Sequence, residues 1–492
     1  MSTHDLIIGG ADGALIRQLG RMSNRHGLVA GATGTGKTVT LQVLAEGFSR
    51  MGVPVFAADV KGDLSGIAAE GRPHPKIEER LKKIPLPHYR QQPSPTAFWD
   101  LDGRYGHSIR TTMSEMGPLL LGNLLELNDT QTGVLYAGFD LADEQGLLLL
   151  DLKDLRSLLN WMADHKGELR SAYGNISSAS VGAIQRRLLV MEEQGADLFF
   201  GEPALSLDDL MHRDFSGRGV ISILDVRRVI HQAPRVYAAF LLWLLAEMFE
   251  QLPEAGDQEA PKLVLFFDEA HLLFEGAPKP ILDKIEQVVR LIRSKGVGVY
   301  FITQSPLDIP EDVAGQLGLK IQHALRAFTP KDRKTIKAVA ESFRINPGLD
   351  TAQAVTQLGI GEALVSSLDD EGSPTPVMRT LIAPPEGKIG PIDDDKRREL
   401  IQRSPMKGRY DLAIDRESAY ELLKKRADQA EVQEAEVKAQ QASSQTSSAG
   451  GGTGRRRQSI GEAMAKSAAR AMGSQIGRQI IRGVLGSLFR KR

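Results

Sequence analysis

The sequence contains no cysteine among its 492 residues, so it forms no disulfide bond and no thiolate metal site. An extracellular scaffold held together by disulfides is therefore excluded. Aromatic residues make up only 5% of the chain, while the apolar fraction of 41% is ordinary for a globular protein. The length allows one large α/β core with insertions, or two or three domains.

The sequence also lacks a long apolar run. The longest run, Val236 to Ala246, is bounded by Arg235 and Glu247 and falls short of the ~20 residues that a bilayer span needs. Residues 1–20 show no basic segment followed by an apolar core and a small-residue cleavage site, so we expect no secretion signal. The sequence predicts a soluble, cytoplasmic protein.

A large net charge is missing too, but the value of −1 conceals an uneven distribution. Residues 455–492 contain ten Lys or Arg and a single acidic residue, Glu462, which leaves residues 1–454 with a net charge of −10. A body this acidic does not indicate a broad nucleic-acid-binding face.

Apolar stretches alternate with helical patterns over much of the chain. Gly27 to Ala30 and Val53 to Ala58 predict strands on either side of a helix from Lys37 to Met51. Further strands are predicted at 219–225, 262–267, 297–303 and 319–325, before a β-hairpin of 362–367 and 375–382. Because the strands are continuous apolar runs, we expect a mostly parallel sheet covered on both faces.

Changes in composition divide the chain into six segments. They are the first part of an α/β core (1–70), a mostly helical insertion (71–218), the second part of the core (219–383), a helical extension (384–439), a flexible linker rich in Ser, Gln and Gly (440–458) and a basic amphipathic tail (459–492).

The basic tail repeats aliphatic and small residues at helical spacing, with Lys and Arg between them. The apolar positions are Ile460, Met464, Ala468, Met472, Ile476, Ile480, Val484 and Leu488. Such a helix would bind an acidic surface. The candidates are a membrane, DNA and the acidic body of a neighbouring subunit. The alternative is a partly disordered solubilising tail, because its glycines weaken an isolated helix.

A phosphate-binding motif follows the first of these strands. Residues 31–38 read GATGTGKT, which matches GxxxxGK[ST] between a strand and a helix. The glycines let backbone N–H groups surround an anion, and the helix N-terminus adds partial positive charge. Lys37 would neutralise the β and γ phosphates of ATP, and the Thr38 hydroxyl would hold Mg²⁺. The expected nucleotide contacts are Gly31, Ala32, Thr33, Gly34, Thr35, Gly36, Lys37, Thr38 and Val39.

Two carboxylates end a later predicted strand, where Leu263 to Phe267 is followed by Asp268 and Glu269. One carboxylate near Mg²⁺ can organise the water shell of the metal, and its neighbour can orient or deprotonate the attacking water. We assign Asp268 to Mg²⁺ and Glu269 to the water. Alone, this pattern would indicate an ordinary strand end, but together with the phosphate loop it predicts ATP hydrolysis.

Polar residues end two other strands on the same predicted edge. Gln304 would lie beside the γ phosphate and report its presence, or it simply terminates its strand. Asp59 and Asp63 either lie near the metal, sense the nucleotide or form an ordinary loop of Asx turns, and the residue types favour the loop.

Five stretches of the sequence, in this order, resemble the HerA/FtsK superfamily of P-loop ATPases, and among them bacterial YjgR-type proteins with a HerA-like C-terminal helicase domain. They are NRHGLVAGATGTGKT (24–38), FAADVKGDLSG (56–66), LVLFFDEAHLLF (263–274), VRLIRSKGVGVYFITQSP (289–306) and IQHALRAFTPKD (321–332). The resemblance implies a RecA-like sheet, a ring that is usually hexameric, and ATP hydrolysis at subunit interfaces that drives DNA through a channel.

The resemblance also singles out two arginines. Arg25 precedes the first of these strands and Arg293 lies in the IRSKGVG segment, and either would stabilise γ-phosphate charge in its own chain or in a neighbouring subunit. A surface or helix-capping salt bridge is the alternative for each. Arg326 is a further candidate.

Three functions fit the sequence. The first is a ring-forming ATPase that acts on DNA as a helicase or translocase. The second is an ATPase that acts on a protein or membrane-bound partner through the basic tail. The third is a nucleotide-dependent assembly switch.

Overall fold

A computed structural model of the chain describes residues 5–87, 89–256, 258–275, 279–326 and 329–446. The chain forms two compact units, Met1–Lys424 and Lys425–Arg492. Within the described ranges, no helix combines the length and the apolar character that a membrane span requires.

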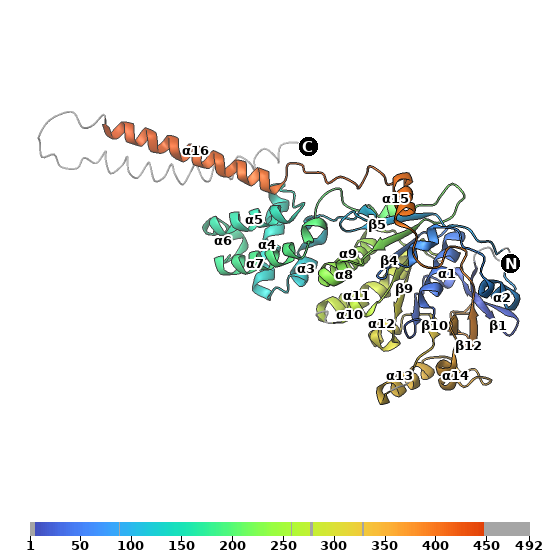
Figure 1. Cartoon of the computed structure of the whole chain (residues 1–492). Coiled ribbons are helices and arrows are strands. Elements are labelled where there is room, and N and C mark those ends of the chain that lie inside the picture. Colours follow the sequence, from blue (N-terminus) through green and yellow to red (C-terminus); the bar gives the residue numbers. More distant parts are fainter. Residues whose placement is uncertain (1–4, 88, 257, 276–278, 327–328, 447–492) are drawn as a thin grey trace, which may run out of the picture. The chain divides into compact units, whose positions relative to one another are not determined.

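A twelve-stranded sheet runs through the first unit (Figure 1), in the order β2-β1-β12-β11-β10-β3-β9-β8-β4-β7-β5-β6. The strands are β1 (Asp5–Ala11), β2 (Ala14–Leu19), β3 (Gly27–Ala30), β4 (Val55–Asp59), β5 (Thr96–Asp100), β6 (His107–Ser108), β7 (Ile221–Asp225), β8 (Leu263–Phe267), β9 (Val297–Thr303), β10 (Leu319–His323), β11 (Glu362–Ser366) and β12 (Met378–Ile382). From β10 to β6 all neighbours are parallel, whereas β11, β12, β1 and β2 pair antiparallel. The predicted mostly parallel α/β fold is confirmed.

Sixteen α-helices occur in the described ranges. They are α1 (Lys37–Arg50), α2 (Pro75–Lys83), α3 (Met113–Leu124), α4 (Asp129–Gln145), α5 (Leu152–Asp164), α6 (Lys166–Tyr173), α7 (Ser178–Glu193), α8 (Val229–Gln232), α9 (Pro234–Gln251), α10 (His271–Phe274), α11 (Lys279–Ile292), α12 (Glu311–Ala314), α13 (Pro330–Glu341), α14 (Thr351–Gln357), α15 (Asp394–Arg403) and α16 (Ala419–Thr446).

Both faces of the parallel sheet are covered, which explains why its strands are apolar throughout. Successive residues of a strand point to opposite faces, so Val29 packs in one core with Leu44 and Phe48 of α1, while Leu28 belongs to the other core. That second core contains Phe240 of α9 and the apolar face of α11.

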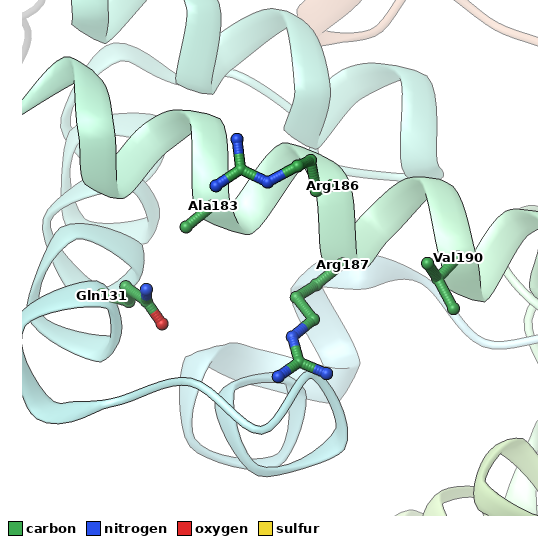
Figure 2. A pocket seen from close by; sticks show the side chains of 5 residues that line it. All are labelled: Gln131, Ala183, Arg186, Arg187 and Val190. Carbon is green, nitrogen blue, oxygen red and sulfur yellow. The ribbon is translucent and has the colours of Figure 1, made fainter.

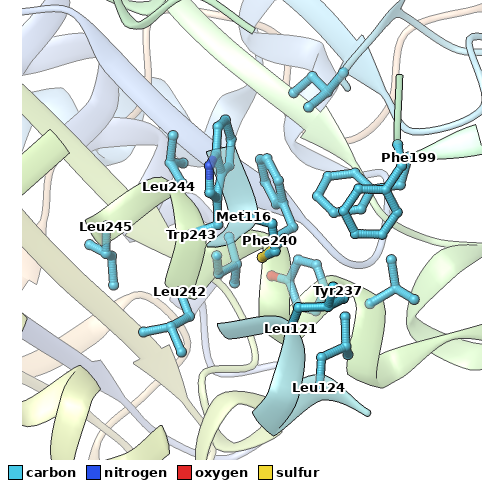
Figure 3. Close-up of a cluster of buried hydrophobic side chains, with 14 of the residues drawn as sticks. Met116, Leu121, Leu124, Phe199, Tyr237, Phe240, Leu242, Trp243, Leu244 and Leu245 are labelled. Atoms are coloured by element: carbon cyan, nitrogen blue, oxygen red, sulfur yellow. The ribbon is translucent and has the colours of Figure 1, made fainter. Parts of the chain in front are cut away.

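Helix α9 links the sheet to the group of helices α3 to α7. Tyr237, Phe240 and Trp243 are buried along α9 beside Met116 and Leu121 of α3 (Figure 3). The helices of this group begin at well-formed caps, since Thr112, Asn128 and Asp151 each form a capping box with the residue three positions later. The predicted helical insertion therefore packs onto the sheet as part of the first unit.

The structure adds detail to three of the predicted segments. The insertion at 71–218 contributes β5 and β6 to the sheet, where β5 pairs with β7. Residues 384–439 are not helical throughout, because 384–393 before α15 and 404–418 between α15 and α16 contain no α-helix and only isolated β-bridges. Helix α16 continues to Thr446, so the first part of the predicted linker is helical. The rest of the linker and the basic tail lie outside the described residues.

Candidate functional site

The phosphate-binding motif forms a loop between β3 and α1. Gly31, Gly34 and Gly36 all have positive φ, of 152°, 78° and 114°. A side chain is strained in this conformation, so the spacing of the glycines follows from the shape of the loop. The loop is anchored to its neighbours, because the N–H of Gly31 donates to Thr303 at the end of β9 and the N–H of Ala32 donates to Ala324 after β10.

The side chain of His323, at the end of β10, packs against Gly31 of the phosphate loop. A Cβ atom at Gly31 would lie 2.5 Å from the His323 Cβ, so only glycine fits there. The His323 Nδ1 contacts the Glu362 carbonyl oxygen at 3.0 Å, and its Nε2 contacts the Thr40 hydroxyl at 2.8 Å. Burial lowers the pKa of His323 to about 4, so the ring is neutral at physiological pH.

The part of the loop formed by residues 33–36 is open to an anion. Within the described part of the chain, no group accepts a hydrogen bond from the N–H of Thr33, Gly34 or Gly36. No side chain caps the N-terminus of α1, and a Cβ at Gly34 would meet no heavy atom within 4 Å. The free N–H groups and the helix dipole together fit a phosphate chain.

Lys37 lies inside this loop, 5% exposed. Its Nζ donates to the carbonyl oxygens of Gly31 at 2.7 Å and Ala32 at 3.3 Å. Burial and the nearby ammonium group of Lys61 lower the pKa of Lys37, while Glu269 and Asp268 act in the opposite direction. Thr38 and Val39 follow in the first turn of α1, half-buried.

Asp268 and Glu269 lie on the same edge of the sheet as the loop. They follow β8, and only β9 separates β8 from β3, so the two strand ends are about 10 Å apart. Burial, together with the charge of Glu269, raises the pKa of Asp268 to about 6. Gln304 follows β9, and its Nε2 lies 3.4 Å from Glu269 Oε2. The structure thus gathers the loop, both carboxylates and Gln304 at one place.

Glu269 has an unusual backbone conformation and a cationic partner. Its φ is +48°, a left-handed conformation that costs a residue with a side chain about 1–3 kcal/mol. Its Oε1 lies 2.7 Å from the Nζ of Lys61, in the loop after β4. Burial acts to raise the pKa of Glu269, but the hydrogen bonds and charges of Lys61, Gln304 and Lys37 lower it overall.

The loop after β4 has the turn structure that its aspartates predict. The Asp59 carboxylate accepts the N–H groups of Gly62 at 2.7 Å and Leu64 at 3.1 Å. Burial and the charge of Asp63 raise the pKa of Asp59 to about 7, with Asp268 adding to the effect. The Asp63 Oδ1 is buried without a hydrogen-bond partner among the described residues.

Arg25 and Arg293 lie at the opposite edge of the sheet. Arg25 precedes β3, whereas the phosphate loop follows that strand, and four residues of strand span about 13 Å. Arg293 precedes β9 in the same way, and its carbonyl oxygen accepts the Asn24 side chain at 3.4 Å. The structure therefore places both arginines at the edge of the sheet away from the phosphate loop of their own chain. Arg326 is exposed after β10.

Two residues of the site, Lys61 and His323, are absent from the sequence predictions. The rule that carboxyl ends of parallel strands share one edge could have found both, because Lys61 lies between Asp59 and Asp63 and His323 is the last residue of β10. A lone lysine or histidine carries little signal without the strand order.

The residues fit ATP and Mg²⁺. Thr38 supplies a hydroxyl and Asp268 a carboxylate, the oxygen ligands that Mg²⁺ uses together with phosphate oxygens and water. Among the described residues, no group of three or more His, Asp or Glu side chains is arranged to hold a metal by itself.

A separate hollow of about 360 Å³ lies on the helical group (Figure 2). It is lined by Gln131, Ala183, Arg186, Arg187 and Val190, on α4 and α7. It shares no residue with the phosphate loop. The Arg187 guanidinium pairs with Glu126 at 3.3 Å, so part of its charge is already balanced.

One known structure shares the overall fold, and two others are similar to a smaller degree. VirB4 of Thermoanaerobacter pseudethanolicus matches with a TM-score of 0.51 and 16% identity, over 78% of this chain and 97% of that chain. The unbound bacterial conjugative coupling protein TrwBdeltaN70 matches with a TM-score of 0.48 and 18% identity, over 78% of this chain and 90% of that chain. The plasmid coupling protein TrwB in complex with ADP and Mg²⁺ matches with a TM-score of 0.44 and 18% identity, over 75% of this chain and 89% of that chain.

None of the curated proteins compared with the sequence matches it. The family model described as Helicase HerA-like C-terminal matches residues 5–492, and the sheet is of the RecA-like P-loop kind. The chain therefore belongs to the HerA-like C-terminal helicase family, within the HerA/FtsK superfamily of P-loop ATPases.

Proposed function

We propose that the chain binds ATP with Mg²⁺ and hydrolyses it, as a subunit of a ring that moves or remodels DNA in the cytoplasm. The observation that carries the proposal is the shared edge, where the open phosphate loop lies beside Asp268, Glu269 and Gln304. Membership of the family supports a motor ATPase.

The roles of the residues follow from their positions. The N–H groups of the loop and Lys37 bind the β and γ phosphates, while Thr38 and Asp268 hold Mg²⁺. The bound metal would supply positive charge that offsets the charge developing on the phosphate. Glu269 orients the attacking water and accepts its proton, and Gln304 contacts Glu269 from the neighbouring strand.

The placement of Arg25 and Arg293 supports a ring. Neither lies near a phosphate bound at the loop of its own chain, because the length of the strands β3 and β9 separates the arginines from that loop. An edge that carries two arginines is suited to face the γ phosphate of an adjacent subunit, where a guanidinium stabilises transition-state charge. A head-to-tail contact of this kind forms a ring when its rotation closes, and the family resemblance implies a ring that is usually hexameric.

ATP turnover with and without single- and double-stranded DNA tests this proposal, alongside a mass measurement. We expect hydrolysis that DNA stimulates and a nucleotide-dependent oligomer. The same rate with and without every DNA form would contradict action on DNA and leave the ATPase assignment standing. Absence of turnover in all conditions would contradict both.

A second function, action on a protein or membrane-bound partner, is favoured by the charge distribution. Residues 455–492 contain ten Lys or Arg and one acidic residue, whereas residues 1–454 have a net charge of −10. A basic segment of this kind binds an acidic partner surface. Deletion of residues 459–492 should then abolish capture of the partner and leave hydrolysis intact. Unchanged localisation and capture after the deletion would count against this function.

A further inference from the structure

Lys61 lies in a loop whose backbone is held by hydrogen bonds, and its side chain is partly exposed. The Asp59 carboxylate binds the N–H of Gly62 and of Leu64, which fixes the backbone on the C-terminal side of Lys61. Arg227 packs against Gly62, where a Cβ would lie 2.6 Å from the Arg227 Cδ. The Lys61 side chain is 39% exposed, whereas that of its partner Glu269 is 6% exposed. The exposure of Lys61 leaves room for its side chain to turn toward a bound phosphate, whereas the Glu269 side chain is enclosed.

The surroundings keep Lys61 charged and close to the phosphate loop. Burial lowers the pKa of Lys61, but Glu269, Asp268 and Asp63 outweigh this effect and raise it overall. The charge of Lys61 in turn lowers the pKa of Lys37. The ammonium groups of Lys37, in the phosphate loop, and of Lys61, in the loop after β4, are thus close enough to affect each other.

The pair between Lys61 and Glu269 would oppose hydrolysis, because it engages the carboxylate that the proposed reaction needs. The Lys61 ammonium group occupies Glu269 Oε1 at 2.7 Å and the Gln304 amide lies 3.4 Å from Oε2, so both carboxylate oxygens already have a donor in place of water. A terminal phosphate carries more negative charge than one carboxylate and offers three acceptor oxygens to the three donors of a lysine. An ammonium group within reach of both would move toward the phosphate.

We propose that Lys61 is a positioning residue that distinguishes ATP from ADP: it holds Glu269 until a γ phosphate is bound, and then exchanges the carboxylate for that phosphate. The inference rests on the proposed function, since it requires a nucleotide at the phosphate loop. The exchange releases Glu269 beside Gln304, free to accept the proton of the attacking water.

Calorimetric titration with Mg²⁺ and either ADP or the imido analogue of ATP tests the exchange. In the Lys61→Met variant, the analogue should bind about tenfold or more weakly than to wild type. ADP affinity should change less than about twofold, because ADP lacks the phosphate that Lys61 contacts. Lys83→Met is a matched control, since Lys83 forms an ion pair of the same 2.7 Å length with Glu79 on the exposed surface.

Glu269→Gln provides a second readout. The neutral amide competes less well for Lys61, so the analogue should bind a few-fold more tightly than to wild type. The gain should vanish when Lys61→Met is also present, because the competition is then gone. A purely structural role of Lys61 predicts no such coupling.

Two results would overturn the inference alone. One is that Lys61→Met weakens the binding of ADP and of the analogue equally. The other is that Glu269→Gln changes the affinity for the analogue equally in the wild type and in the Lys61→Met variant. Failure of the wild type to bind either nucleotide would instead overturn the proposed function and, with it, this exchange.

Discussion

At the scale of single residues, the glycines of the phosphate loop serve different purposes. Gly31 is required because His323 fills the space where a side chain would be. Gly34 has open space around it, and its constraint is the positive φ together with access for the ligand.

Gly34→Ala should therefore separate binding from folding. The positive φ costs alanine about 1–2 kcal/mol, so the protein should still fold. The added methyl group would occupy the space that the loop offers to phosphate, and ATP affinity should fall at least about tenfold. Thermal unfolding and nucleotide titration check the two parts. Wild-type affinity in a folded variant would show that phosphate binds elsewhere.

His26 makes stability depend on pH. Its Nε2 lies 2.8 Å from the Val289 carbonyl oxygen and its Nδ1 accepts the N–H of Val299 at 3.0 Å, so only the neutral ring satisfies both contacts. Burial lowers its pKa from the ordinary 6.5 to about 4. The unfolded chain then binds more protons than the folded one below pH 6.5, and the stabilisation is lost as the pH falls from 6.5 toward 4.

His26→Gln should remove this dependence. Between pH 8 and pH 5 the unfolding free energy of the wild type should fall by about 2 kcal/mol more than that of the variant. Urea denaturation at the two pH values measures the difference. Parallel losses in both proteins would mean that His26 does not titrate in this way.

At the scale of elements, α15 fastens the segment after β12 to the carboxyl edge of the sheet. Arg397 and Asp225 are both 5% exposed and pair at 2.9 Å. Arg397 also lies over the rings of Phe98 and Tyr105, at 4.8 Å and 5.8 Å from their centroids. Arg227 binds the same Asp225 carboxylate through its Nε and one terminal nitrogen.

Arg397→Met should cost roughly 2 kcal/mol of unfolding free energy, because one of two charged partners of a buried carboxylate is lost. Arg398→Met is the matched control on the same helix, as Arg398 pairs with Asp395 in solvent, and it should leave stability unchanged. Chemical denaturation of both variants checks the prediction. Equal stability of the two variants would show that α15 does not fasten this segment.

The sequence predicts the elements whose pattern is strong and misses those whose pattern is weak. Strands such as β3, β8 and β9 are continuous apolar runs because both faces are buried, and they are confirmed. β1 contains two glycines and β2 contains Arg17 and Gln18, so the N-terminal hairpin has little apolar signal. β5 directly follows a Pro-rich stretch that indicates a loop.

Some residues of the candidate site could be predicted from the sequence, and others could not. The motif at 31–38 and the two carboxylates after β8 could be predicted, because their residue types and spacing carry the chemistry. The pairing of Lys61 with Glu269 could not, because it depends on β4 lying next to β8 in a sheet whose order the sequence does not state. The roles proposed for Arg25 and Arg293 depend on a neighbouring subunit and stay predictions.

At the scale of the whole molecule, the proposed ring would bring one edge of the sheet in each subunit against the opposite edge in the next subunit. Its active site would need Glu269 from one subunit and an arginine from the next. This arrangement makes a prediction about mixtures of inactive variants, because each variant can supply what the other lacks.

Glu269→Gln subunits mixed with subunits carrying Arg25→Ala and Arg293→Ala should regain activity. Each protein alone should be inactive, whereas random assembly at equal amounts makes roughly a quarter of the interfaces competent. The rate of ATP hydrolysis after mixing and re-assembly measures the recovery. A mixture as inactive as its components would contradict catalysis across subunits.

The central claim is that the loop at 31–38 and the Asp268–Glu269 pair act on one bound ATP. Phosphate release by Glu269→Gln at saturating ATP and Mg²⁺, with nucleotide binding verified on the same sample, tests it most directly. We predict that the variant binds ATP at least as tightly as the wild type and releases phosphate at least about 100-fold more slowly. Phosphate release at the wild-type rate by the nucleotide-bound variant would contradict the claim.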